Sequence, residues 1–188
     1  MLRFVSTNDG KVREAKRYLR EYDSVSQVAF DYPEIQSDSL EPIVEYGARE
    51  AYVGVGADEP VFIEDSGLFI RSLGGFPGPY SSYVYDTLGI DCVADLVSEE
   101  SSSRASFRSV IGYCDGDSTE VFVGSVQGRI VEPRGSGGFG YDPIFEHNGQ
   151  TFAEITVDEK NAVSHRGRAL ATFASWLAGD PGDQVGTA

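Results

Sequence analysis

A strongly apolar stretch in the first half of the chain is interrupted by two acids. Residues 61–63 are β-branched or aromatic and predict a strand that is buried on both faces. Glu64 and Asp65 end this run, and residues 66–67 break the pattern before residues 68–70 resume it. Because adjacent strand residues point to opposite faces, one carboxylate can reach a cleft while the other turns away or supports it. The alternative is an ordinary strand end with solvated acids.

Hydrophobic spacing predicts further helices and strands along the rest of the chain. Val12, Ala15, Leu19 and Tyr22, for example, fall on one face of a helix. The predicted helices span residues 10–22, about 42–56, 80–85, 88–97 and from 164 onward. The predicted strands span residues 2–5, 25–30, 105–113 and 120–130. The last two strands form a hairpin that should widen the sheet.

Two of the predicted helices begin with cations, at the end where the helix dipole disfavours positive charge. Lys11 lies in the first turn of one helix, whose start Asn8 or Asp9 can cap, and His165 and Arg166 open the last helix. A cation there costs a few tenths to about 1 kcal/mol unless an anion is bound. A strand, a small polar turn and a helix start with lysine can hold phosphate. The alternative is an ordinary capped helix with a surface lysine.

A glycine-rich segment at residues 135–140 matches the pattern GxGxxG. Residues 141–143 are Tyr-Asp-Pro, so no helix can begin well there and we reject a dinucleotide-binding interpretation. The glycines instead suggest a flexible backbone that wraps closely about a flat ligand, with Phe139 as a stacking platform. The alternative is a plain surface loop.

The charge balance is strongly acidic, with 15 basic and 30 acidic residues and a formal net charge of −15. This argues against duplex DNA or an anionic membrane as a partner, because both require a basic patch. A salt-rich cytoplasm explains the acids better, since about 1 M salt limits charge repulsion to about 3 Å. We therefore expect a halophilic protein. Lysine is rare, which makes Lys11 and Lys160 candidates for positions that require a point charge.

The length of 188 residues suits one domain of ordinary size. We expect a single domain of two lobes over residues 1–188, with residues 179–188 as a flexible tail. No long apolar run and no signal-like segment after Met1 is present, so we expect a soluble, cytoplasmic protein. Cys92 and Cys114 lie outside any CxxC motif and are expected to be free, half-buried thiols.

The remaining candidate chemistry combines carboxylates with cations. Neither His147 nor His165 has the sequence context of a serine or cysteine nucleophile, so covalent catalysis is the least favoured mechanism. Carboxylates with cations suit the binding of Mg²⁺ and phosphates and the activation of water. The candidates are Glu34, Glu64, Asp65, Lys11, Lys160 and Arg166.

Four ordered motifs resemble those of the inosine triphosphate pyrophosphatase family. These enzymes hydrolyse non-canonical purine nucleoside triphosphates such as ITP, dITP and XTP to the monophosphate and pyrophosphate. The motifs are STNDGK at residues 6–11, EDSGL at 64–68, FGYDP at 139–143 and SHR at 164–166. Thr7 replaces a usual glycine, and Arg49 stands where many members have a phosphate-facing lysine.

The resemblance implies an α/β fold, with a long, bent, mixed β-sheet whose flanking helices form two lobes around a central cleft. It also implies a homodimer. Asp65 would be the general base, and Asp65 and Glu34 would bind Mg²⁺. The implied substrate-binding residues are Ser6, Thr7, Asn8, Asp9, Gly10, Lys11, Ser66, Ser82, Phe139, Gly140, Tyr141, Asp142, Lys160, His165 and Arg166. Within this set, His165 and Arg166 would donate hydrogen bonds to the 6-oxo group of the base.

Two alternative functions share this cleft. One is a pyrophosphatase for modified pyrimidine nucleotides, which product profiling would distinguish. The other is a non-catalytic nucleotide-binding sensor, which repeated pyrophosphate release would exclude. In each case the expected partner is a nucleotide, and neither nucleic acid nor a membrane is expected.

Overall fold

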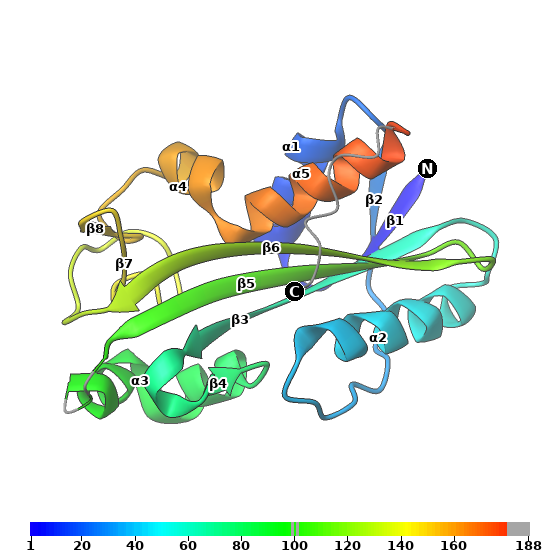
Figure 1. The fold of residues 1–188 in the computed structure, drawn as a ribbon. Coiled ribbons are helices and arrows are strands. Elements are labelled where there is room, and N and C mark those ends of the chain that lie inside the picture. The colour runs from blue at the N-terminus through cyan, green and yellow to red at the C-terminus, as the bar shows by residue number, and fades with distance from the viewer. Residues whose placement is uncertain (99, 101, 180–188) are drawn as a thin grey trace.

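A computed structural model describes residues 1–98, 100 and 102–179, which are built around one eight-stranded mixed sheet (Figure 1). The strand order is β2-β1-β3-β5-β6-β7-β8, and β4 pairs with β3 beside this path. The strands are β1 (Leu2–Val5), β2 (Val25–Val28), β3 (Val61–Ile70), β4 (Pro77–Gly78), β5 (Arg104–Cys114), β6 (Thr119–Ile130), β7 (Phe145–His147) and β8 (Gln150–Thr151).

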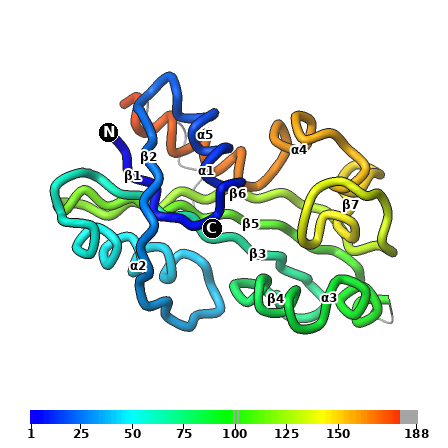
Figure 2. Tube along the Cα trace, turned by 180° about the vertical axis from the view of Figure 1, so that it is seen from behind, coloured from blue at the N-terminus to red at the C-terminus, as the bar shows by residue number. Residues whose placement is uncertain are grey.

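Helices cover both faces of the sheet. Figures 1 and 2 show α1 and α5 on one face and α2 on the other, while α3 lies beside β4 near one end of the long strands. The helices are α1 (Asp9–Leu19), α2 (Leu40–Gly54), α3 (Ser81–Ser98), α4 (Val157–Val163) and α5 (His165–Leu177), with a 3-10 turn at Arg71–Leu73.

Side chains alternate between the two faces of each strand, so each face of the sheet has its own hydrophobic core. Phe4 and Phe62 stack at 4.4 Å and pack with Phe173 of α5 on one face. Val5 and Ile63, the next residue of each strand, join the α2 core on the other face. A third core lies between α3, the far ends of β3, β5 and β6, and the β7–β8 region.

The central strand is continuous, so the predicted break at residues 66–67 is wrong. β5 pairs with β3 along its whole length, from Val61↔Cys114 to Ile70↔Ala105. Gly67 interrupts the apolar pattern for another reason: a side chain there would lie 2.2 Å from the carbonyl oxygen of Gly78 in β4. The acids are therefore held in the middle of a strand.

One side of β3 has a short unpaired stretch. β1 pairs with β3 only at residues 61–62, and β4 pairs only at residues 68–69. Among the described residues, 63–67 therefore have no strand partner on that side. We call residues 63–67 the open edge. Because no strand covers this side, side chains from either face of β3 can reach the space beside it.

Most of the other predicted elements are confirmed. β5 and β6 form the expected hairpin, and α3 contains two helical segments because Gly89 has a left-handed φ of 75°. The predicted ends of two elements are too late, since α1 ends at Leu19 and β2 at Val28. The short strands β4, β7 and β8 and the helix α4 were not predicted.

Residues 180–188, most of the predicted tail, lie outside the described residues. Cys92 is half-buried and Cys114 is buried, and both are free thiols. Among the described residues, no helix is both long enough and apolar enough to cross a membrane.

Candidate active site

A cavity of about 700 Å³ lies at the open edge of β3. Its walls come from the turn after β1, the loop after β2, the start of α3, the glycine-rich loop at residues 135–140 and the start of α5. A cavity of this size accommodates a nucleotide-sized ligand. All the predicted site residues line it except Asp9 and Gly10.

Asp9 and Gly10 instead lie in the first turn of α1, outside the cavity, so the prediction that they contact substrate is not supported by their position. Asn8 is the N-cap, and its Oδ1 accepts hydrogen bonds from the backbone N–H groups of Gly10 (2.9 Å) and Lys11 (3.1 Å). Asp9 accepts a hydrogen bond from Gln27. The N–H groups of Gly10 and Lys11 are thus already used by the cap, which leaves the Lys11 ammonium as the candidate for phosphate binding at this helix start.

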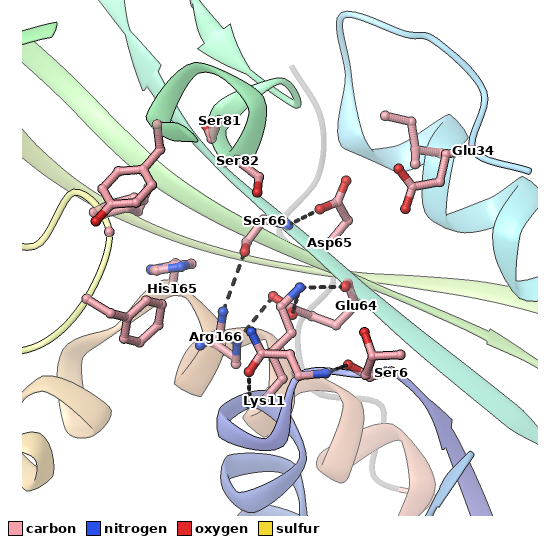
Figure 3. A pocket seen from close by; sticks show the side chains of 18 of the residues that line it. Ser6, Lys11, Glu34, Glu64, Asp65, Ser66, Ser81, Ser82, His165 and Arg166 are labelled. Atoms are coloured by element: carbon pink, nitrogen blue, oxygen red, sulfur yellow. Dashed lines mark hydrogen bonds and ion pairs between the residues drawn. The ribbon is translucent and has the colours of Figure 1, made fainter. Parts of the chain in front are cut away.

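Asp65 lies on the face of β3 that points toward Glu34, which comes from the loop after β2 (Figure 3). Its Oδ1 accepts a 2.7 Å hydrogen bond from the Ser66 N–H. Burial, with the nearby charges of Glu64 and Glu34, outweighs the attraction of Lys11 and raises the pKa of Asp65 to about 6. Asp65 can therefore accept a proton near neutral pH.

Glu64 points to the opposite side of β3 and is 8% exposed, which excludes a solvated strand end. The Ser109 hydroxyl donates a 2.6 Å hydrogen bond to its Oε1. Lys11 Nζ lies 2.8 Å from Oε2, and Arg166 Nε lies 3.3 Å from Oε1. Burial alone would raise the pKa of Glu64, but the charges of Arg166 and Lys11 hold this pKa well below its ordinary value.

Both cations at helix starts therefore have an anionic partner within the protein. Lys11 Nζ also donates to the Glu64 carbonyl oxygen (3.0 Å), and its side chain is largely buried, which excludes a surface lysine. Arg166 is held from a second side by Glu14 (3.1 Å) and reaches Ser66 Oγ at 3.5 Å. The anion that the structure places beside both cations is the internal carboxylate of Glu64, and a bound anion at these helix starts stays a prediction.

The glycine-rich loop is fixed by Asp142. The Asp142 carboxylate accepts hydrogen bonds from the Phe139 N–H (2.8 Å) and from Lys160 Nζ (2.5 Å). Gly138 has φ of 70°, and a side chain there would lie 2.1 Å from Asp142 Oδ2, so the loop requires glycine. Lys160 Nζ lies 4.3 Å from the centroid of the Phe139 ring, which is 60% exposed. Phe139 thus offers an exposed aromatic face at the cavity.

His165, the first residue of α5, lines the cavity. Its ring stacks on Phe107 at 4.8 Å, and its buried Nδ1 has no hydrogen-bond partner among the described residues. Burial, reinforced by the Arg166 charge, lowers the pKa of His165 well below its ordinary value. The imidazole is therefore neutral and offers one donor and one acceptor.

Several cavity residues were not predicted from the sequence, among them Asp31, Tyr32, Tyr85, Asp86 and Phe107. Aromatic residues in a strand or amphipathic helix are indistinguishable from core residues by pattern alone. Asp31 and Tyr32 directly precede Pro33 and Glu34, and this proximity to Glu34 was the available signal.

Two further residues named in the sequence analysis have clear contacts. Arg49, which stands where many members of the resembled family have a phosphate-facing lysine, lies outside the cavity and bonds to Glu45 and Thr119. Tyr141 lines the cavity, but its hydroxyl donates to the Ser81 carbonyl oxygen at 2.8 Å.

No complete protein-only metal site is formed by the described residues: no three His, Cys, Asp or Glu side chains converge as ligands. Mg²⁺, however, commonly takes one or two carboxylates and completes its octahedron with substrate phosphates and water. Asp65 and Glu34 face each other across the cavity as two oxygen donors (Figure 3). This donor set fits a hard cation that arrives with a phosphorylated ligand.

The fold and cavity define an α/β nucleotide hydrolase with an acidic strand edge. The chain belongs to the Ham1 family, whose model matches residues 2–176. It is 51% identical over 180 residues to the dITP/XTP pyrophosphatase of Thermococcus kodakarensis, covering 94% of this chain and 96% of that protein. It is 52% identical over 178 residues to the dITP/XTP pyrophosphatase of Methanopyrus kandleri, covering 92% and 94%.

Solved structures show the same fold. A HAM1 protein from Coxiella burnetii superposes with a TM-score of 0.83 at 32% identity, covering 95% of this chain and 98% of that one. The family resemblance seen in the four motifs is therefore confirmed.

Proposed function

We propose that this enzyme hydrolyses non-canonical purine nucleoside triphosphates, among them ITP, dITP and XTP, to the monophosphate and pyrophosphate. The observation that carries the proposal is the arrangement around Asp65. A carboxylate that can accept a proton near neutral pH lies beside Lys11 and Ser66 in a nucleotide-sized cavity. Several relatives named dITP/XTP pyrophosphatases support the substrate class.

In the proposed reaction a water oxygen forms a bond to the α-phosphorus while the bond to the α–β bridging oxygen breaks. Asp65 accepts the proton from the water, and the bridging oxygen leaves with pyrophosphate. Lys11 neutralises charge on the phosphates. Arg166, which reaches Ser66, contributes positive charge to the same region of the cavity.

Asp65 and Glu34 would hold Mg²⁺ together with the triphosphate. The ion would supply charge neutralisation on the phosphates and the leaving pyrophosphate. The two carboxylates suit this ion because they leave most coordination positions to phosphate and water.

The purine would stack on Phe139 in this proposal, with His165 and Arg166 near its 6-oxo group. Lys160 and Asp142 would shape the loop that carries the stacking face. A neutral imidazole can donate to a carbonyl oxygen, whereas an adenine amino group would present another donor.

Three further expectations accompany this function. A single domain is supported by the one sheet that runs through all three cores. The homodimer is supported by the family resemblance, and light scattering of the purified protein tests it. A cytoplasmic location is supported by the proposed substrates, because the nucleotide pool is in the cytoplasm. Fractionation of the cells tests it.

Pyrophosphate release from ITP, XTP, dITP, ATP and GTP, with chromatography of the monophosphate product, tests the proposal. We expect release from the first three at many turnovers per site, and much less from ATP. The exposed Asp117→Asn variant serves as a control for Asp65→Asn. Release of single phosphates, a preference for modified pyrimidines, or binding without turnover would overturn the proposal.

A further inference from the structure

The most deeply buried charged side chain at the cavity is that of Glu64. The proposed reaction uses it neither as the proton acceptor nor as a metal ligand. Its side chain is 2% exposed, compared with 19% for Lys11 and 8% for Arg166. It lies one residue before Asp65 in β3 but points to the other face of the strand (Figure 3). Its carboxylate is thus close to the reaction centre while facing away from Glu34.

Glu64 connects three elements of the site. Lys11 comes from α1, Arg166 from α5 and Ser109 from β5, and all three contact the same carboxylate. Ser109 is fully buried and sits opposite Ser66 in the β3–β5 ladder. Its hydroxyl is therefore held by rigid backbone and fixes the orientation of the Glu64 carboxylate.

The contacts to Glu64 leave hydrogen-bonding capacity unused. Glu64 Oε2 and Arg166 Nε are both buried, and neither has a hydrogen-bond partner among the described residues. Glu64 Oε2 lies within ion-pair distance of Lys11 Nζ, and Arg166 Nε lies within ion-pair distance of Glu64 Oε1. Neither pair has the geometry of a hydrogen bond. The cluster is therefore electrostatically paired but incompletely bonded, and its cations retain donors for another anion.

Resting on the proposed function, we propose that Glu64 is a positioning residue. Its carboxylate, fixed by Ser109, holds Lys11 and Arg166 at the open edge of β3 so that both meet the triphosphate beside Asp65. It acts neither as the proton acceptor nor as a metal ligand.

The kinetic consequence follows from its charge. Glu64→Gln removes a negative charge near the phosphates, so substrate affinity is maintained or improved, but both cations lose their fixed positions. A displacement of about 1 Å at a reacting group can lower the rate about 100-fold. We therefore expect kcat to fall about 10- to 100-fold while KM is unchanged or lower.

Two companion variants separate positioning from folding. Ser109→Ala removes the fixing hydroxyl and should lower kcat in the same way by a smaller factor, about 3- to 10-fold. Glu64→Asp keeps the charge but shortens the side chain by one methylene, so it should recover only part of the kcat that Glu64→Gln loses. If Glu64→Gln does not fold, these two variants still test the proposal.

Glu146→Gln is the matched control. Glu146 is also a buried strand glutamate held by two cations, Arg129 and Arg134, but it lies outside the cavity. It should lower the melting temperature without a change in KM or kcat. If Glu64→Gln behaves in the same way, the role of Glu64 is structural and the proposal is wrong.

The assay measures pyrophosphate release from ITP by each folded variant, at several Mg²⁺ concentrations. The expected result is an unchanged half-saturating Mg²⁺ concentration in Glu64→Gln and a raised one in Glu34→Gln. A raised value in Glu64→Gln, or a raised KM at full kcat, would overturn the positioning role. Absence of release by the wild-type protein would instead overturn the proposed function and this inference with it.

Discussion

At the scale of single residues, Asp65 combines a functional advantage with a cost to stability. Burial raises its pKa in the folded protein to about 6, above the ordinary value of 3.8. The folded state therefore keeps the proton after the unfolded state has lost it, so stability falls as pH rises between about 4 and 6. Above that window the metal-free protein carries the full cost of a buried carboxylate beside two other acids.

Asp65→Asn should accordingly move activity and stability in opposite directions. Loss of the proton acceptor should lower kcat by about 10²- to 10⁴-fold. Removal of the charge should stabilise the metal-free protein at pH 7 by about 1 to 3 kcal/mol, and flatten its stability between pH 4 and 6. Urea unfolding across this pH range measures the second effect. Near-normal turnover would mean that Glu64 or Glu34 accepts the proton instead.

Base selection should depend on His165 and phosphate binding on Lys11. His165→Phe keeps the stacking on Phe107 and removes only the polar edge of the ring. We expect it to narrow the ratio of kcat/KM between ITP and ATP by about 10- to 100-fold. Lys11→Ala should lower kcat/KM for both substrates equally, because phosphate is common to both. An equal effect of His165→Phe on both substrates would show that this ring does not contact the base.

Arg166→Ala is a weaker test of base selection than the sequence suggested. The structure places the Arg166 guanidinium between Glu14 and Glu64, both largely buried. Its removal would leave Glu14 without its cation and Glu64 with Lys11 as its one remaining cation among the described residues, which is destabilising. A loss of activity in this variant would therefore combine unfolding with loss of a substrate contact.

At the scale of secondary structure, glycine allows helices to lie directly on the long strands. A side chain at Gly124 of β6 would lie 2.1 Å from the His165 carbonyl oxygen and 2.3 Å from the Ala169 nitrogen. A side chain at Gly112 of β5 would lie 2.4 Å from the Val44 carbonyl oxygen in α2, on the other face. The close approach of α5 to β6, and with it the position of His165, therefore requires glycine at position 124.

Gly124→Ala should therefore displace the start of α5 and damage both stability and catalysis. We expect a loss of about 1 to 3 kcal/mol in the free energy of unfolding, since backbone atoms must move. We also expect at least a tenfold loss of kcat/KM for ITP. Gln127→Ala, at an exposed position of the same strand, is the control. Full activity in Gly124→Ala would show that α5 can shift without consequence for the site.

The elements that the sequence predicted well are those with strong periodicity. β5 and β6 are long, apolar and joined by a polar turn, so their hairpin was readily predicted. α4 has no buried residue, and therefore no apolar face that could reveal it. β3 was wrongly divided because Gly67 reflects the close approach of β4, a tertiary contact that local pattern does not contain.

The site was predictable where its residue types are chemically specific. Asp65, Lys11 and His165 belong to motifs, and all three line the cavity. Asp9 and Gly10 belong to a motif too, but they serve the helix cap, which spacing alone cannot distinguish from ligand contact. The direction in which Glu64 points depends on the face of the strand, and only the structure reveals its partners.

At the scale of the whole molecule, the excess of 15 acidic residues should make stability depend on salt. Charge repulsion extends about 10 Å at 0.1 M salt and about 3 Å at 1 M. We expect the melting temperature to rise between about 0.1 M and several molar KCl, with unfolding, or dissociation of the proposed dimer, at low salt. Calorimetry and light scattering measure the two effects. A melting temperature that does not change over this range would contradict a halophilic adaptation.

The cavity also unites distant parts of the sequence, since Lys11 and Arg166 contact one carboxylate at position 64. During synthesis, α1 and β3 emerge long before α5, so the cluster around Glu64 cannot form until the last helix is present. Such long-range closure slows folding, because loop entropy is lost before the contacts that reward it are made. Because His165 and Arg166 lie in α5, we expect a growing chain to lack activity until the α5 segment has been made and has packed against β6.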